Sequence, residues 1–151
     1  MTREMKREGL ALLLMRFGIA WFIFLWAIHK IITPKQYQGL ARHFDGVDLS
    51  FAQIYGVAAL QIIICILVLI GAFRLFSYSA IMVMHLFTIS RRWEKFIDPF
   101  ALSDKGFPIN RNVSIDIAVI CAMIALILLM HRDHFSIGGW KKLQGRGRWW
   151  L

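Results

Sequence analysis

Four apolar runs, separated by polar segments, divide the chain. They cover residues 10–32, 51–73, 75–92 and 113–131. A helix needs about 20 residues to cross the hydrocarbon layer of a bilayer, and each run approaches or exceeds that length. The pattern therefore predicts an all-α integral membrane protein. We expect residues 1–151 to form a single membrane domain in which four transmembrane helices make one bundle.

The polar segments are two loops, 33–50 and 93–112, and a tail, 132–151. In the first loop, Tyr37, Leu40, Ala41 and Phe44 recur at the spacing of one helix face, which predicts a short interfacial helix lying flat on the membrane. The second loop contains prolines and a glycine, and we expect it to be irregular. The second and third runs are separated only around Arg74, so they should form a tight antiparallel hairpin. The basic, Trp-rich tail is typical of an interfacial anchor.

Composition and charge support a membrane location and exclude a nucleic-acid partner. Hydrophobic residues make up 58% of the chain, above the soluble average of about 45–50%. The net charge of +9 would suggest nucleic-acid binding in a soluble protein, but the basic residues flank the apolar runs. Membrane lipids are therefore the expected partner. With four crossings both termini lie on one side, and the basic N-terminus favours the cytoplasmic side of a bacterial inner membrane.

Four polar residues, Arg16, Gln61, His85 and Asp116, lie within the apolar runs. Such groups are costly in hydrocarbon, so they tend to face the bundle interior and to mark function. Each also has a structural explanation. Arg16 could snorkel to nearby headgroups, and Gln61 could bridge two helices. His85 could bond a backbone carbonyl, and Asp116 could suit the dipole at a helix start.

Depth along the helices groups several of these residues. At about 1.5 Å per residue, His29, Lys30, His85 and Asp116 fall in the half of the bundle that faces the loops, and Gln61 lies near the middle. This predicts a polar pocket for a quinone headgroup or a small anion. His85 or His29 could donate a hydrogen bond to a quinone carbonyl, and Asp116 could relay the proton that reduction requires.

No intrinsic cofactor is expected from the sequence. Haem would require His29 and His85 to face each other at one depth, and His29 lies close to its helix end, which disfavours haem. His131 and His134 have a spacing that could bind a metal, but only Asp133 could add a third ligand there. We interpret these three residues as a solvated helix end and predict no metal site.

Three segments resemble the DoxX-like family of small membrane proteins. LLMRFGIAWF at 13–22, followed by HKI at 29–31, is similar to the family's first helix, with an early arginine and a lysine near the far end. Residues 57–76 resemble the second helix. DHFSI at 133–137 is similar in place to the family's serine-containing ending after the last helix.

The resemblance implies a four-helix membrane protein tied to redox chemistry. The related DoxD and DoxA proteins form a thiosulfate:quinone oxidoreductase, and other members accompany oxidoreductases. Gly71 and Arg74 match features of the family's second helix, whereas Gln61 stands where the family has a glutamate. A glutamine cannot carry a proton, so this departure disfavours independent catalysis.

Three functional hypotheses follow. The first is an accessory subunit of a membrane oxidoreductase or quinone-linked respiratory complex, with other membrane subunits as partners. The second is a quinone-interacting oxidoreductase in its own right. The third is a small-solute or ion carrier built around Arg16 and Gln61. The sequence leaves open whether the chain is an enzyme and favours an accessory or binding subunit.

Overall fold

The computed structural model of the chain describes residues 1–110 and 112–145, and its regular structure there is helical. The prediction of an all-α protein is confirmed. Arg111, from the second loop, and residues 146–151, from the predicted basic tail, lie outside the described residues. The elements in chain order are α1 (Arg3–Ile32), α2 (Pro34–Asp45), α3 (Phe51–Ile70), α4 (Arg74–Ser90), α5 (Glu94–Ile97), α6 (Asn112–Leu129), the 3-10 helix η1 (Met130–Arg132) and α7 (Ile137–Leu143).

Three helical segments are long and apolar enough to cross a membrane. They are Arg3–Ile32, Phe51–Ile70 and Ile115–Leu143, which correspond to the first, second and fourth apolar runs. The third run forms α4, which has 17 residues, or about 25 Å at 1.5 Å per residue. The length and apolar character of the three segments indicate a membrane protein.

Local sequence explains where several helices begin and end. α1 stops at Thr33 because the following Pro34 disfavours helical geometry in the residue before it, and Pro34 then occupies the first turn of α2. Ser50 and Gln53 form a reciprocal capping box at the start of α3. Gly71 ends α3 with a φ of +67°, a left-handed conformation that glycine adopts without steric cost.

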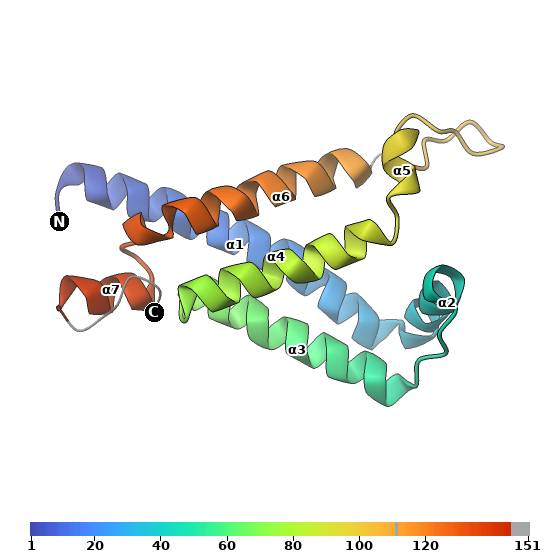
Figure 1. The fold of residues 1–151 in the computed structure, drawn as a ribbon, viewed down its shortest axis with the longest axis horizontal. Helices are drawn as coiled ribbons and strands as arrows, with labels where there is room; N and C mark the ends of the chain where they lie inside the picture. Colours follow the sequence, from blue (N-terminus) through green and yellow to red (C-terminus); the bar gives the residue numbers. More distant parts are fainter. Residues whose placement is uncertain (111, 146–151) are drawn as a thin grey trace.

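The long helices run side by side and define two ends of the molecule (Figure 1). The N-terminus and α7 lie at one end, which we call the terminal end, and α2 and α5 lie at the other, which we call the loop end. α3 and α4 form the antiparallel hairpin predicted from the sequence, and α4 lies between α3 and α6. The core between the helices is apolar and includes Leu12, Ile19, Ile23, Ile64, Val68, Tyr78, Ile81, Met123 and Leu126.

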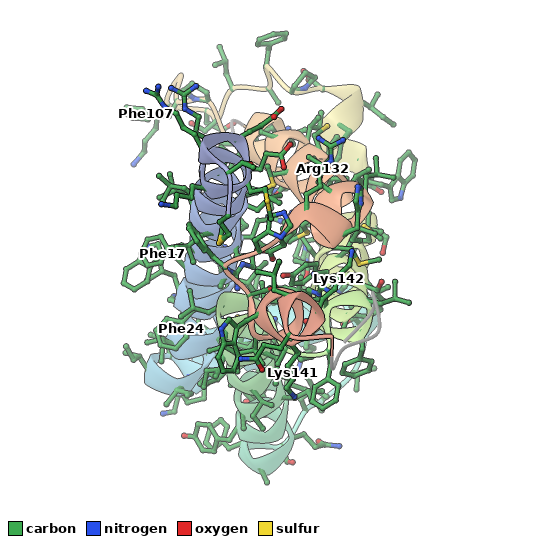
Figure 2. All side chains as sticks on the ribbon, turned by 90° about the vertical axis from the view of Figure 1, so that its left-hand side faces the viewer. Phe17, Phe24, Phe107, Arg132, Lys141 and Lys142 are labelled. Atoms are coloured by element: carbon green, nitrogen blue, oxygen red, sulfur yellow. The ribbon has the colours of Figure 1, made fainter. Side chains whose placement is uncertain are left out.

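The outer surface of the bundle is also apolar. Large side chains such as Phe17, Leu60 and Phe87 are more than half exposed, and Figure 2 shows Phe17 pointing away from the bundle. Water-soluble monomers rarely expose such a continuous apolar surface. This surface is suited to contact with lipid.

The chain after α6 folds back over the terminal end. Figure 2 shows α7 lying across this end of the bundle, with the basic side chains Lys141 and Lys142 on it. The backbone N–H of Gly138 donates to the carbonyl oxygen of Gly71 at 3.2 Å, which joins α7 to the turn between α3 and α4. The first part of the predicted tail is therefore packed against the bundle.

Candidate functional site

A buried polar cluster, the terminal cluster, lies beneath α7 and consists of Arg16, Arg74, Tyr78, Asp133 and Ser136. Arg16 and Asp133 are both 0% exposed, and Arg16 Nε lies 3.2 Å from Asp133 Oδ2. The Tyr78 hydroxyl donates to the same carboxylate oxygen at 2.7 Å. Helices α1 and α4 are thus both tied to the segment that follows η1.

The two arginines of this cluster also bind backbone carbonyls. Arg16 donates from Nη1 to Leu69 O at 2.8 Å and from Nη2 to Phe135 O at 3.0 Å. Arg74 donates from Nη1 to Met130 O at 2.6 Å. Carbonyls at helix ends lack partners within the helix, so Arg16 satisfies the Leu69 carbonyl in the last turn of α3. Met130 O accepts from the N–H of Asp133 as well, at 3.2 Å.

Close backbone packing completes the terminal cluster. The Ser136 hydroxyl donates to Asp133 O at 2.6 Å and accepts from the N–H of Gly139 at 2.9 Å. A side chain at Gly71 would overlap Ser136, and one at Gly139 would overlap Asp133. The terminal cluster leaves little room for a ligand and is best explained as a structural connection.

Two interpretations made from the sequence are wrong. Asp133 does not belong to a solvated helix end, because it is fully buried and pairs with Arg16. The snorkelling alternative for Arg16 is also wrong, because its guanidinium points into the bundle and binds three oxygen atoms of other segments. One feature of the sequence could have predicted the pairing of Arg16 with Asp133: a buried arginine requires a carboxylate on its own side of the membrane.

Near the loop end, Lys30 and Gln61 form a buried pair between α1 and α3. Lys30 Nζ donates to Gln61 Oε1 at 2.7 Å and reaches Trp26 O at 3.4 Å. The ammonium also lies 4.9 Å from the centre of the Tyr37 ring, a cation–π contact that links it to α2. Both side chains of the pair are 7% exposed.

A second group, the loop-end cluster, consists of His85, Arg92 and Asp116 at the contact of α4 with α6. His85 Nε2 lies 3.8 Å from Asp116 Oδ1, which is too long for a hydrogen bond. Arg92 Nη2 lies 3.5 Å from Asp116 Oδ2, at the limit of one. The edge of Phe22 on α1 packs against the His85 ring, with centroids 5.7 Å apart.

The loop-end cluster is incompletely hydrogen-bonded, unlike the Lys30–Gln61 pair. Within the described residues, the buried atoms His85 Nε2 and Arg92 Nε have no hydrogen-bond partner. Buried polar groups are nearly always paired in folded proteins, so these atoms are suited to bind an oxygen-bearing ligand. Two atoms of the terminal cluster, Arg16 Nε and Asp133 Oδ1, also lack a hydrogen-bond partner in the described part of the chain, but the close packing at Gly71 and Gly139 closes that cluster. The loop-end cluster is therefore the candidate functional site.

The two charged side chains of the candidate site balance each other, because Arg92 faces Asp116 at 3.5 Å. The other basic residues near the loop end have partners of their own: Arg91 forms an ion pair with Asp45, and Lys30 donates to the Gln61 amide. The balanced charge favours a neutral oxygen acceptor as the ligand.

The structure brings some of the predicted site residues together and separates others. Lys30 meets Gln61, and His85 meets Asp116. His29 joins neither group: it is half-buried, and its Nε2 lies 3.2 Å from the hydroxyl of Thr33, one helical turn away. Among residues 1–110 and 112–145, no three histidine, cysteine or acidic side chains converge on a common metal position.

Arg92 is the residue of the candidate site that the sequence reasoning missed. It is the last residue of the third apolar run, where a basic residue is expected to face lipid headgroups. Its side chain is only 23% exposed and turns toward Asp116. A carboxylate inside an apolar run requires a nearby cation, and this requirement could have pointed to Arg92 as the partner of Asp116.

No family model, curated protein or solved structure matches the chain. The DoxX-like resemblance therefore stays a prediction, and the function has to be inferred from the residues and their geometry.

Proposed function

We propose that the chain is a four-span membrane protein that binds a quinone headgroup at its loop end and serves as an accessory subunit of a membrane oxidoreductase. The observation that carries the proposal is the loop-end cluster. His85, Arg92 and Asp116 are largely buried, and they present polar atoms that lack protein partners among the described residues. A quinone carbonyl is a neutral acceptor that suits the N–H donors of His85 and Arg92.

The packing of α4 supports its assignment as the fourth span. At 17 residues it reaches the lower limit of about 17–25 residues for a transmembrane helix. It packs against both α3 and α6, and it exposes Phe76, Val83 and Phe87 on its outer face. Four spans place both termini on one side, and the basic N-terminal segment favours the cytoplasmic side of a bacterial inner membrane.

The proposed chemistry of the chain is limited to binding and proton transfer. His85 Nε2–H donates a hydrogen bond to one quinone carbonyl, and Asp116, 3.8 Å from His85, exchanges a proton with His85 or with the reduced headgroup. Arg92 holds the Asp116 carboxylate in place. Electrons come from the partner oxidoreductase.

The Lys30–Gln61 pair supports an accessory role over independent catalysis. Gln61 occupies the position of the family's glutamate under the resemblance, and it binds Lys30 as a neutral acceptor at 2.7 Å. A neutral amide holds the lysine but cannot relay a proton. The two residues are better suited to join α1 to α3 than to react.

The geometry gives no support to a carrier built around Arg16 and Gln61. Arg16 binds Leu69 O in the terminal cluster. Gln61 lies eight residues before Leu69 on α3, a separation of about 12 Å along the helix at 1.5 Å per residue. Each side chain is engaged in its own group of contacts. A substrate path that joined Arg16 to Gln61 would have to break the contacts of both side chains.

The experiment is purification of the full chain in a mild detergent, followed by identification of companion proteins and extraction of bound quinone. Wild type should carry quinone and a companion subunit. His85→Ala should lose quinone about tenfold, the effect of one lost buried hydrogen bond. His43→Ala is the matched control, because His43 is an exposed histidine on α2 and its loss should change nothing.

Two results would contradict the proposal. Equal quinone content in folded His85→Ala and in wild type would show that His85 does not bind the headgroup. Recovery of quinone-containing chain without a companion, but with quinone turnover of its own, would instead favour the independent quinone-linked enzyme.

A further inference from the structure

An apolar groove of about 490 Å³ lies between α1 and α6 on the outside of the bundle. Its lining is apolar and includes Gly18, Ile19, Ala118, Val119 and Ala122. The small residues create the space: a Cβ added at Gly18 would meet no atom within 4 Å. A groove of this kind between two long apolar helices opens toward lipid.

The groove adjoins the loop-end cluster. On α1, Ile19 lies one helical turn before Phe22, whose ring packs against His85 at 5.7 Å between centroids. On α6, Val119 lies one turn after Asp116. Side chains three apart on a helix are surface neighbours, so the α6 wall of the groove ends beside Asp116 and the α1 wall ends beside Phe22, which packs on His85.

We infer that this groove holds the first part of the isoprenoid tail of the quinone whose headgroup binds at His85, an inference that rests on the proposed function. A headgroup in the cluster must direct its tail outward, and the groove is an apolar path that starts there. Its volume falls within the range of about 300–1,000 Å³ for small-molecule sites.

The tail suits the groove better than a helix of a partner protein does. The lining covers residues 15–19 on α1 and 115–122 on α6, about 6 Å and 10 Å along the two helix axes. Two transmembrane helices that pack stably share a seam over several turns. A single flexible hydrocarbon chain needs only this short length.

The experiment uses the full chain in liposomes with a quinone that carries a diazirine on its second isoprene unit. After illumination, adducts are mapped by mass spectrometry. Adducts should concentrate in residues 15–19 and 115–122, and an excess of a tailless benzoquinone with the same headgroup should remove them. Ala118→Leu fills the groove and should lower the adduct yield about tenfold.

Two further variants keep this test interpretable. Gly18→Ala adds one methyl group to the open space and should lower the yield in the same direction, even if Ala118→Leu folds poorly. Ala59→Leu is the matched control, since Ala59 is exposed on α3 away from the groove. Its adduct yield should equal that of wild type.

The inference is overturned if adducts spread evenly over the lipid-facing helices. It is also overturned if a diazirine phospholipid labels the groove equally well and the tailless benzoquinone does not compete, because the occupant is then a lipid chain. Binding of the tailless benzoquinone, measured in the same liposomes, separates the two proposals. Headgroup binding without groove adducts overturns only the tail site, whereas no headgroup binding to wild type overturns both.

Discussion

Neutralising Asp133 should strongly destabilise the protein. In Asp133→Asn the side chain keeps its shape, but Arg16, which is 0% exposed, loses the carboxylate 3.2 Å from its Nε. Removing one partner of a buried ion pair leaves an uncompensated charge and costs about 3–5 kcal/mol. We expect a loss of this size, a large share of the roughly 5–15 kcal/mol that stabilises a typical domain.

An exposed ion pair at the same end of the molecule provides the control. Arg132 Nη1 lies 2.7 Å from Glu8 Oε1, and the Arg132 side chain is 54% exposed. Because solvent screens such pairs, Glu8→Gln should cost no more than about 1 kcal/mol. The difference between the two carboxylate-to-amide changes measures the effect of burial.

A double variant tests whether charge is the cause. Arg16→Met removes the unpaired cation, so Arg16→Met combined with Asp133→Asn should be less destabilised than the sum of the two single variants. The assay is reversible unfolding by SDS in mixed micelles, followed by the fluorescence of the six tryptophans. A loss for Asp133→Asn as small as that for Glu8→Gln would refute a dry, closed terminal cluster.

Further changes test the close packing and the loop-end pair by the same unfolding assay. Gly71→Ala should cost more than about 1 kcal/mol, because the residue has a φ of +67° and a Cβ would overlap Ser136. Gly39→Ala on α2, where a Cβ meets nothing within 4 Å, should stabilise by about 0.5–1 kcal/mol; an equal loss at both glycines would contradict the packing. Gln61→Leu should cost about 1–3 kcal/mol by removing the 2.7 Å acceptor of Lys30. Gln61→Glu should retain wild-type stability, because a glutamate keeps an oxygen acceptor for Lys30. A loss of stability as large as that of Gln61→Leu would contradict the Lys30–Gln61 hydrogen bond.

Local sequence patterns were sufficient to predict much of the helical structure. The first, second and fourth apolar runs overlap the three segments that could cross a membrane. The spacing of apolar residues in the first loop predicted a helix where α2 occurs, over Pro34–Asp45. These features depend on neighbours a few residues apart, which a sequence displays directly.

The terminal cluster depends on contacts that no local pattern contains. Asp133 meets Arg16 and Tyr78 only because the chain turns back after η1 and packs α7 on the Gly71 turn. In sequence, Asp133 stands among basic and polar residues just beyond an apolar run. Its neighbours there suggest solvent, and its burial is decided by the tertiary fold.

The sequence predicted the level of the candidate site along the helices, but not which side chains meet there. Counting residues along the helices placed His85 and Asp116 in the same half of the bundle, and the structure brings them within 3.8 Å. The same count grouped His29 with them, although its side chain turns to Thr33. Depth fixes the level of a residue along a helix, whereas rotation about the helix axis depends on how the helices pack.

The quinone-headgroup site is tested most directly by the infrared spectrum of a quinone labelled with ¹³C at a single carbonyl and bound to the full chain in liposomes. A hydrogen bond from His85 should lower the stretching frequency of one carbonyl relative to quinone in lipid alone, and His85→Ala should abolish that shift while His43→Ala preserves it. A carbonyl frequency that equals the value in lipid, or a shift that persists in folded His85→Ala, would contradict the account.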